Sequence, residues 1–209
     1  MKYLQSSLAV LLLAITTGCA VGNKYDYSSV SVSLPLQGSG ELGVAVVENR
    51  AYVVSGDKAP DFIGIQRGGF GNPFNVTTKS GKPLTEDMAA SLGAALERSG
   101  FKVSALDVRS PDASVIAAAA TRQGQQRNVI LKVNEWKTDV MMRIRLIYDL
   151  DLQITDGAGR TIASNRLQGD EVIGGGGFEG QNAGSASSSF EAKIGRLFNK
   201  PEIFAALGE

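Results

Sequence analysis

The chain has 209 residues, of which 43% are apolar and 20% are charged, and its 21 basic residues balance its 21 acidic ones. This length suits one domain with a sizeable core, and the balanced charge argues against a nucleic-acid partner. Because the sequence contains no histidine and one cysteine, it cannot form a Ser-His-Asp or Cys-His nucleophile site, a histidine metal site or an internal disulfide.

The N-terminal residues follow the plan of a signal peptide. Lys2 supplies a positive charge, residues 8–15 are apolar, and small or polar residues lead to Gly18 and Cys19. The apolar run is too short to span a bilayer as an anchor helix. We therefore predict a signal peptide at 1–18 that is removed from the mature protein.

The single cysteine stands at the expected cleavage point. Gly18 and Cys19 resemble the end of a bacterial lipobox, in which cleavage falls before the cysteine and the cysteine is acylated, although Thr16 replaces the usual leucine. Several acyl chains would hold the protein firmly, whereas one alone is marginal. Ala20 rather than Asp follows Cys19, and by the sorting rule of enterobacterial lipoproteins this resembles an outer-membrane destination. The alternative is an ordinary secretory signal that is cleaved after Ala20 and discards Cys19.

A tether and a series of short strands are expected next. Residues 19–41 contain Gly, Ser, Asn and Pro without a clear period, so we expect a lipidated tether. The alternation at 29–34 leaves open a short edge strand near Val30, Val32 and Leu34. The apolar runs at 42–48, 52–54 and 62–65 each fit a short strand. The Gly- and Asn-rich residues 67–76 indicate a shaped loop.

Two helices are expected on either side of a further strand. Thr85 is suited to cap a helix at 85–99, whose apolar side chains recur every three or four residues and which Gly100 ends. A strand follows at 101–106, and an alanine-rich helix follows at 112–122.

The clearest pattern is an unbroken alternation of apolar and polar residues over 142–154. Residues 129–140 fit the strand before it, and residues 161–172 fit the strand that returns after a Gly-containing turn. Such alternation is typical of antiparallel strands with one buried and one wet face. We therefore predict one α+β domain at 42–209, with an antiparallel-dominated sheet, a three-strand meander and two to three helices packed on one face.

The C-terminal region combines a Gly/Ser-rich stretch with short helices. Residues 173–189 are rich in Gly and Ser, which indicates a functional or a disordered loop. Helical spacing returns at 190–198, and Pro201 separates this helix from a closing helix at 202–207.

Taken together, these elements resemble the YajG-like family of Gram-negative outer-membrane lipoproteins over about residues 15–207. The resemblance is carried by the lipobox at Cys19, the strand 42–46, the helix 85–99 with the strand after it, the alternating strand 142–154 and the ending 200–207. The family has no established activity. The resemblance therefore implies a fold and a location: a lipid-anchored protein of the outer membrane that faces the periplasm.

Four aromatic residues are candidates for contact with a partner. Phe70, Phe74 and Phe178 lie in Gly-rich segments, where an apolar ring either folds back onto the core or forms a contact patch. The alternation puts Trp136 on the same strand face as Lys132, and tryptophan is enriched at interface hot spots. Either a contact role or a partly buried position at the sheet edge would explain Trp136.

Two arrangements could support catalysis, and each has a plainer explanation. Asp149 and Asp151 share the wet face of one strand, where a carboxylate pair could act as acid and base or bind Ca²⁺. Arginines on the same face make cross-strand ion pairs the simpler interpretation. Lys193 follows the serine run 187–189, which would suit a Ser/Lys hydrolase or, more simply, a helix N-cap.

We therefore predict a non-catalytic outer-membrane lipoprotein that binds or assembles with an envelope protein or the cell wall through residues 67–76 and 173–186. We expect no cofactor, metal ion or nucleic acid. One alternative is a lipid- or substrate-handling accessory of an envelope transporter, which requires an apolar groove between helix and sheet. The other is a histidine-free hydrolase, which requires a pocket that gathers Asp or Lys side chains.

Overall fold

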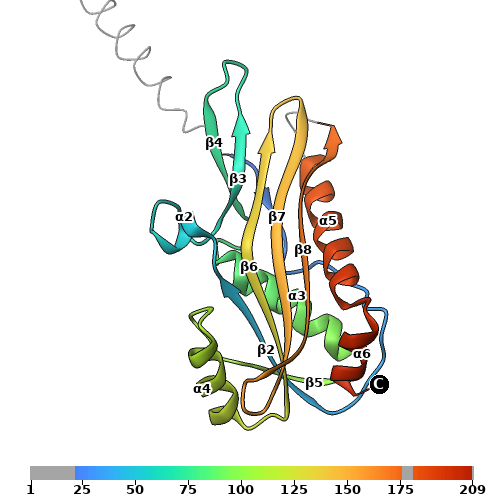
Figure 1. Cartoon of the computed structure of the whole chain (residues 1–209). Coiled ribbons are helices and arrows are strands. Elements are labelled where there is room, and N and C mark those ends of the chain that lie inside the picture. Colours follow the sequence, from blue (N-terminus) through green and yellow to red (C-terminus); the bar gives the residue numbers. More distant parts are fainter. Residues whose placement is uncertain (1–21, 176–180, 209) are drawn as a thin grey trace, which may run out of the picture.

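The computed structural model describes residues 22–175 and 181–208, and all of their side chains except those of 181–183. The predicted signal peptide with Gly18, the acylation site Cys19 and the candidate contact residue Phe178 lie outside the described residues. Figure 1 shows a long, twisted sheet with helices packed against it.

The described chain forms one eight-stranded sheet and several helices. In chain order the strands are β1 (Lys24–Tyr25), β2 (Glu41–Glu48), β3 (Phe62–Arg67), β4 (Pro73–Thr78), β5 (Lys102–Ala105), β6 (Arg127–Val140), β7 (Arg143–Asp156) and β8 (Thr161–Gly175). The helices are α2 (Ala51–Val54), α3 (Leu84–Arg98), α4 (Ala113–Gln123), α5 (Gln181–Phe198) and α6 (Pro201–Leu207). Within the described ranges, no helix is long and apolar enough to cross a membrane.

Strand β6 joins the parts of the sheet. On one side β6 pairs antiparallel with β7, which in turn pairs antiparallel with β8. On its other side, the first part of β6 pairs in parallel with β2 and the last three residues pair in parallel with β3. Strands β2 and β5, and β1 and β4, are also parallel neighbours, whereas β3 and β4 are antiparallel. The α+β class is confirmed, but the sheet is mixed rather than antiparallel-dominated.

The sequence does not show which strands pair in parallel. An antiparallel strand with one wet face alternates polar and apolar residues, as β7 does in its pattern of buried and exposed positions. Strand β2 is almost wholly buried, so its residues form a short apolar run without alternation. Its partners β5 and β6 lie far along the chain, and only the fold brings them beside it.

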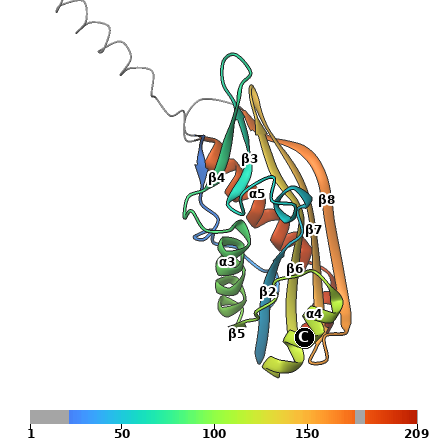
Figure 2. The same ribbon diagram turned by 90° about the vertical axis from the view of Figure 1, so that its left-hand side faces the viewer.

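Helices cover both faces of the sheet. Helices α3, α5 and α6 share the main core with β6 and β7, and Figure 2 shows α3 and α5 on the same side of the sheet. Helix α4 packs on the opposite face of β2, in a smaller cluster that includes Val47, Ile116, Ala119 and Ile130. The expectation of helices on one face is therefore wrong for α4, because the side chains of β2 are apolar toward both faces.

The segment that we expected to be a tether is largely part of the domain. Tyr25, Tyr27, Val32 and Leu36 are buried in the main core. The hydroxyl of Ser91 on α3 also donates a hydrogen bond to the carbonyl of Tyr27. From Tyr25 onward the chain is therefore packed. Over residues 29–36 exposed side chains alternate with the core-facing ones of Val30, Val32, Leu34 and Leu36, although this segment forms no strand.

Two further segments differ from the sequence-based expectations. Residues 52–54 lie in the short helix α2 rather than in a strand, and residues 181–189 form the first half of α5 rather than a loop. In α5 the buried positions include Ala186, Phe190 and Leu197, which lie on one helical stripe. The serines between these positions obscure the stripe in the sequence, so helical spacing is evident only from Phe190 onward.

Candidate functional site

Trp136 belongs to the core, so its predicted role in partner contact is wrong. The side chain is fully buried, and its Nε1 donates a 2.9 Å hydrogen bond to the hydroxyl of Tyr27. The rings of Tyr27 and Phe190 meet it edge-on, with centroids 6.0 and 5.9 Å away. Trp136 therefore joins β6 to the N-terminal segment and to α5.

A β-bulge explains why the alternation misplaced this tryptophan. Val133 pairs with Leu150 and Glu135 pairs with Asp149, which leaves Asn134 without an opposite residue. An extra residue of this kind shifts the side-chain alternation by one position. Residues after the bulge therefore exchange faces, and Trp136 joins Val133 on the buried face.

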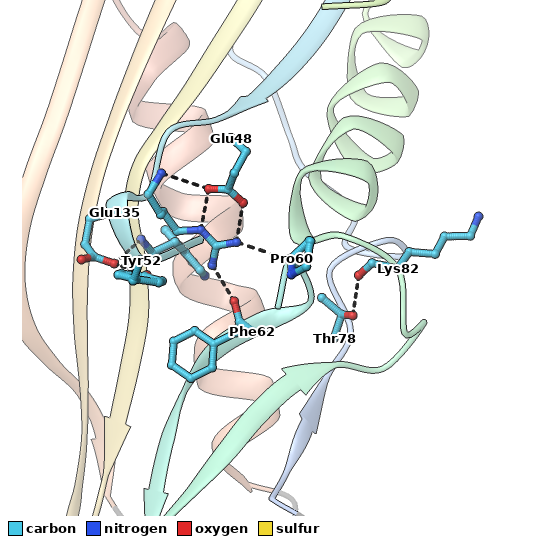
Figure 3. A network of polar contacts seen from close by, with 9 residues as sticks. Glu48, Tyr52, Pro60, Phe62, Thr78, Lys82 and Glu135 are labelled. Carbon is cyan, nitrogen blue, oxygen red and sulfur yellow. Dashed lines mark hydrogen bonds and ion pairs between the residues drawn. The ribbon is translucent and has the colours of Figure 1, made fainter. Parts of the chain in front are cut away.

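A buried arginine fastens the place where β2 leaves β6. Arg50 is wholly buried, and its Nε and one terminal nitrogen donate to the Glu48 carboxylate at 2.8 and 2.5 Å. The guanidinium also donates to the backbone carbonyls of Phe62, at 2.5 Å, and Pro60, at 3.3 Å (Figure 3). Because these hydrogen bonds go to the last residue of β2, the first residue of β3 and Pro60 between them, Arg50 holds this crossover in shape and is not available to a ligand.

The same network continues to the bulge. The hydroxyl of Tyr52 on α2 donates to the carboxylate of Glu135 on β6 (Figure 3). Burial, followed by this hydrogen bond, raises the pKa of Tyr52 well above its ordinary value. Asn49 Nδ2 donates to Asn134 Oδ1 at 2.6 Å. These contacts tie the crossover to the bulged part of β6.

The carboxylates that we considered as a catalytic pair are engaged with neighbouring side chains. Asp149 accepts a 2.7 Å hydrogen bond from Arg166 on β8 and a 3.3 Å bond from Asn134. The Arg166 hydrogen bond and charge hold the pKa of Asp149 below its ordinary value. Asp151 accepts from Gln153 at 2.8 Å. The contacts of Asp149 are the cross-strand pairing that the sequence favoured for the wet face, whereas Asp151 and Gln153 lie on the same strand.

A groove of about 800 Å³ runs between β8 and α5. Lys193 lines it, is buried, and donates to the carboxylate of Glu171 while its ammonium lies 4.6 Å from the centre of the Tyr148 ring. Ser189, four residues earlier on α5, lines the same groove. A lysine that donates to a carboxylate is poorly suited to take a proton from serine, so the geometry does not favour a Ser/Lys pair. The remaining lining residues are Val172, Ile173, Gly184, Ser185, Ser188 and Ala192.

Beside this groove, β8 presents a long open edge. The strand has 15 residues and pairs with β7 on one side, and no strand within the described ranges pairs with its other side. Unpaired strand edges can accept an extended segment of another chain. Residues 162–172 of β8 alternate between exposed and half-buried side chains, and charged residues such as Arg166 and Asp170 stand among the exposed ones. Charges of this kind limit indiscriminate edge pairing.

Two β-turns lie together at the end of the molecule toward which β3 and β6 run, and we call them the hairpin end (residues 68–72 and 141–142). The loop expected at 67–76 is in fact the β3–β4 hairpin, which a 2.9 Å bond from the Gly68 amide to the Asn72 carbonyl closes. Phe70 at its tip is fully exposed, whereas Phe74 is half-buried. Of the candidate contact residues with described side chains, Phe70 is the one with a fully exposed ring.

An ion pair ties the two turns together. Arg67 at the end of β3 donates to both carboxylate oxygens of Asp139 on β6, at 3.0 and 2.8 Å. The same contact holds the pKa of Asp139 below its ordinary value. A shallow pocket of about 400 Å³ lies here, and it is lined by Arg67, Asp139, Met141, Met142, Arg143, Arg145 and Val172.

The chain matches no protein-family model and no curated protein. Solved structures similar to it include protein XCC0632 from Xanthomonas campestris, assigned to family DUF330, with 15% identity, a TM-score of 0.48, and coverage of 86% of this chain and 91% of that one.

Lipoprotein GNA1162 from Neisseria meningitidis is similar at 13% identity and a TM-score of 0.44, over 78% of this chain and 99% of that one. The PelC dodecamer from Paraburkholderia phytofirmans is similar at 13% identity and a TM-score of 0.44, over 80% and 93% of the two chains. These similarities are partial, and they extend neither a role nor a partner to this chain.

Proposed function

We propose that the protein is a non-catalytic lipoprotein, anchored through Cys19 in the outer membrane, whose domain faces the periplasm and binds an envelope protein. The anchor and its location rest on the sequence around Cys19 and on the resemblance to the YajG-like family. The observation that carries the binding role is the open edge of β8 beside the groove that β8 forms with α5.

Strand addition is the form of recognition that suits this surface. The unpaired backbone of β8 offers hydrogen-bond donors and acceptors along an extended line, and these give affinity for a partner segment of any sequence. The groove then supplies side-chain contacts that select among segments. Its polar members, including Ser188, Ser189 and Glu171, suit a polypeptide with polar side chains.

The ion pair in the wall of the groove favours a polypeptide over acyl chains as its ligand. A transporter accessory that carries lipid requires an apolar channel between helix and sheet. Here the buried Lys193 and its partner Glu171 stand in the wall, together with several serine hydroxyls. Placing an acyl chain against this ion pair would remove water from charged groups without replacing their hydrogen bonds.

Crosslinking in living cells tests this proposal. A photoreactive amino acid replaces Gln168, an exposed residue of β8, and in the matched control it replaces Ser114, an exposed residue of α4. We expect a reproducible protein adduct from position 168 and none from position 114. We further expect the adduct to disappear in the Cys19→Ala strain, because the domain is then no longer held at the outer membrane by acyl chains.

Several outcomes would contradict the proposal. Equal adducts at positions 114 and 168, or none at 168, would remove the role of the β8 edge. An unacylated Cys19 in the wild-type protein would contradict the lipid anchor. An adduct of position 168 with phospholipid alone would support the transporter accessory instead.

A further inference from the structure

The chain enters the domain beside the hairpin end. Strand β1 runs parallel to β4, with Lys24 opposite Thr77 and Tyr25 opposite Thr78. Moving from Lys24 toward the N-terminus therefore means moving along β4 toward Pro73 and the turn that carries Phe70. Figure 1 agrees, because β1, the turn between β3 and β4 and the turn between β6 and β7 all lie toward the same end of the sheet.

Close contact holds this entry point against β4. The amide of Thr77 donates a 3.1 Å hydrogen bond to the carbonyl of Asn23. Gly22 approaches Asn75 so closely that an added Cβ would lie 1.9 Å from the Asn75 carbonyl oxygen. Cys19 precedes Gly22 by three residues, a length of chain that reaches no more than about 11 Å. An anchor at Cys19 would therefore hold this end of the domain close to the membrane.

Large apolar side chains are exposed at this same end. Phe70 is 103% exposed, Met142 is 82% exposed and Met141 is 56% exposed, although none of the three is needed to close its turn. Val172 of β8 is 56% exposed. Met141, Met142 and Val172 line one pocket, and Phe70 stands at the tip of the neighbouring turn. Several large apolar side chains exposed at one end of a molecule mark a contact surface.

Basic side chains lie just behind the apolar tips. Arg67 is paired with Asp139, and Arg145 is paired with Asp170. Arg143 begins β7 directly after Met142, is exposed, and has no ion-pair partner among the described residues. Apolar tips backed by arginine match the layers of a bilayer, because arginine can remain among anionic headgroups while its neighbours reach the acyl region.

From this geometry we infer that the hairpin end is a membrane-contact surface: Phe70, Met141 and Met142 insert among the lipids of the bilayer that holds the anchor. The inference rests on the lipid anchor of the proposed function and adds an orientation to it. The strands of the sheet then rise from the membrane, and the edge of β8 stands free beside it for a protein partner.

Depth-dependent fluorescence quenching tests this orientation. Acylation consumes the thiol of Cys19, so a cysteine introduced at position 70 or 142 is the one free thiol of the mature protein. Phe70→Cys and Met142→Cys are labelled with a polarity-sensitive fluorophore in the full-length lipoprotein. Ile162→Cys is the matched control, because Ile162 is also exposed but lies at the start of β8, at the opposite end of the sheet.

The labelled proteins are inserted into vesicles of phosphatidylethanolamine and phosphatidylglycerol that contain a lipid with a nitroxide on its acyl chain. We expect severalfold stronger quenching at positions 70 and 142 than at position 162. Equal quenching at all three positions, in protein that floats with the vesicles, would overturn the inference and leave the anchor intact. Labels at 70 and 142 that are shielded equally without lipid would also overturn it, because a second copy of the chain would then cover these residues.

Mass spectrometry of the Cys19 peptide tests the proposed lipid anchor separately from the membrane-contact surface. An unmodified Cys19 contradicts the proposed anchor and therefore the proposed function. In that case Cys19→Ser versions of the chains, labelled at position 70, 142 or 162 and held by an N-terminal oligohistidine on nickel-chelating lipids, still measure the depth of these positions. Stronger quenching at positions 70 and 142 than at position 162 would support the contact surface, and its absence would overturn it.

Discussion

The two parts of β6 on either side of Asn134 belong to one strand but occupy different environments. From Arg127 to Val133, β6 lies between β2 and β7, and side chains on both of its faces are buried under helices. From Glu135 to Val140, only one face is buried, and the other carries polar side chains such as Lys137 and Asp139. The first part of β6 is therefore buried on both faces, and the second part is buried on one face and exposed to solvent on the other.

Two features with polar side chains set the boundary between these parts of β6. The bulge at Asn134 decides which side chains of the second part turn inward, and Arg50 fixes the crossover at which β3 replaces β2. A strand can therefore change partners and exposure without a break when a bulge resets its faces and a buried side chain satisfies the carbonyls of the departing chain.

The largest effect is expected from removing the side chain that anchors the second part. Trp136→Ala should lower the free energy of unfolding by about 4 kcal/mol, because it opens a cavity between β6, α5 and the N-terminal segment. Urea denaturation followed by circular dichroism measures this loss. Ile130→Ala, in the first part of β6, is the control and should cost less, since its cluster is smaller. A smaller loss for Trp136→Ala than for Ile130→Ala would contradict the comparison.

Removing the arginine at the crossover should have the next largest effect. Arg50→Ala leaves the Glu48 carboxylate and two carbonyls without their donor and should cost about 3 kcal/mol. Urea denaturation again gives the value. Arg50→Lys keeps the charge but not the planar set of donors, so it should recover only part of the loss. Full stability of the lysine variant would show that charge alone holds the crossover.

Deleting the bulged residue tests whether the bulge sets the faces. Asn134 is the extra residue, so its deletion leaves Val133 and Trp136 on the buried face while removing the hydrogen bond to Asn49. We expect a folded protein that loses about 2 kcal/mol. Trp136 is the single tryptophan, and its fluorescence emission should remain that of a buried ring.

Asn134→Ala is the matched control, because it keeps the extra residue and removes the same side-chain hydrogen bonds. A red-shifted emission in the deletion variant, but not in Asn134→Ala, would show that the faces depend on more than the residue count.

The smallest effect is expected on the wet face, where it depends on pH. Arg166 lowers the pKa of Asp149 below its ordinary value of 3.8, so the pair stabilises the protein above that pH and its contribution is lost as the pH falls through the lowered pKa. The difference in unfolding free energy between wild type and Arg166→Ala should therefore be present at neutral pH and shrink in acid.

Urea denaturation across the acidic range measures this difference. Arg143→Ala removes an exposed arginine that forms no ion pair with the described residues, and its effect should not change with pH over the same range. A constant difference for Arg166→Ala would mean that the Asp149 contact contributes nothing to stability.

Sequence periodicity alone predicted the elements that have one buried face and one solvent-exposed face. The amphipathic stripe predicts a helix at 85–99, and α3 spans Leu84–Arg98. The alternation predicts a strand at 142–154, and β7 spans Arg143–Asp156, with Met142 exposed in the turn before it. The wet-face ion pairs were also predictable, because arginine and aspartate alternate on neighbouring strands. In the candidate site the sequence singled out Phe70 but left open whether its ring folds back or is exposed, and the structure shows it exposed.

The sequence by itself determined the α+β class, the antiparallel strands β6 to β8, and the pattern that predicts an acylated Cys19. Tertiary structure decided the parallel pairing of β2 and β3 with β6, the burial of Trp136, and the packing of residues 25–36 into the core. The physical reason is that periodicity reports which faces of one segment meet water. No local pattern records contacts between distant segments. Such contacts decide where a bulge forms, which strands pair, and which turns lie beside the point where the N-terminal segment joins the domain.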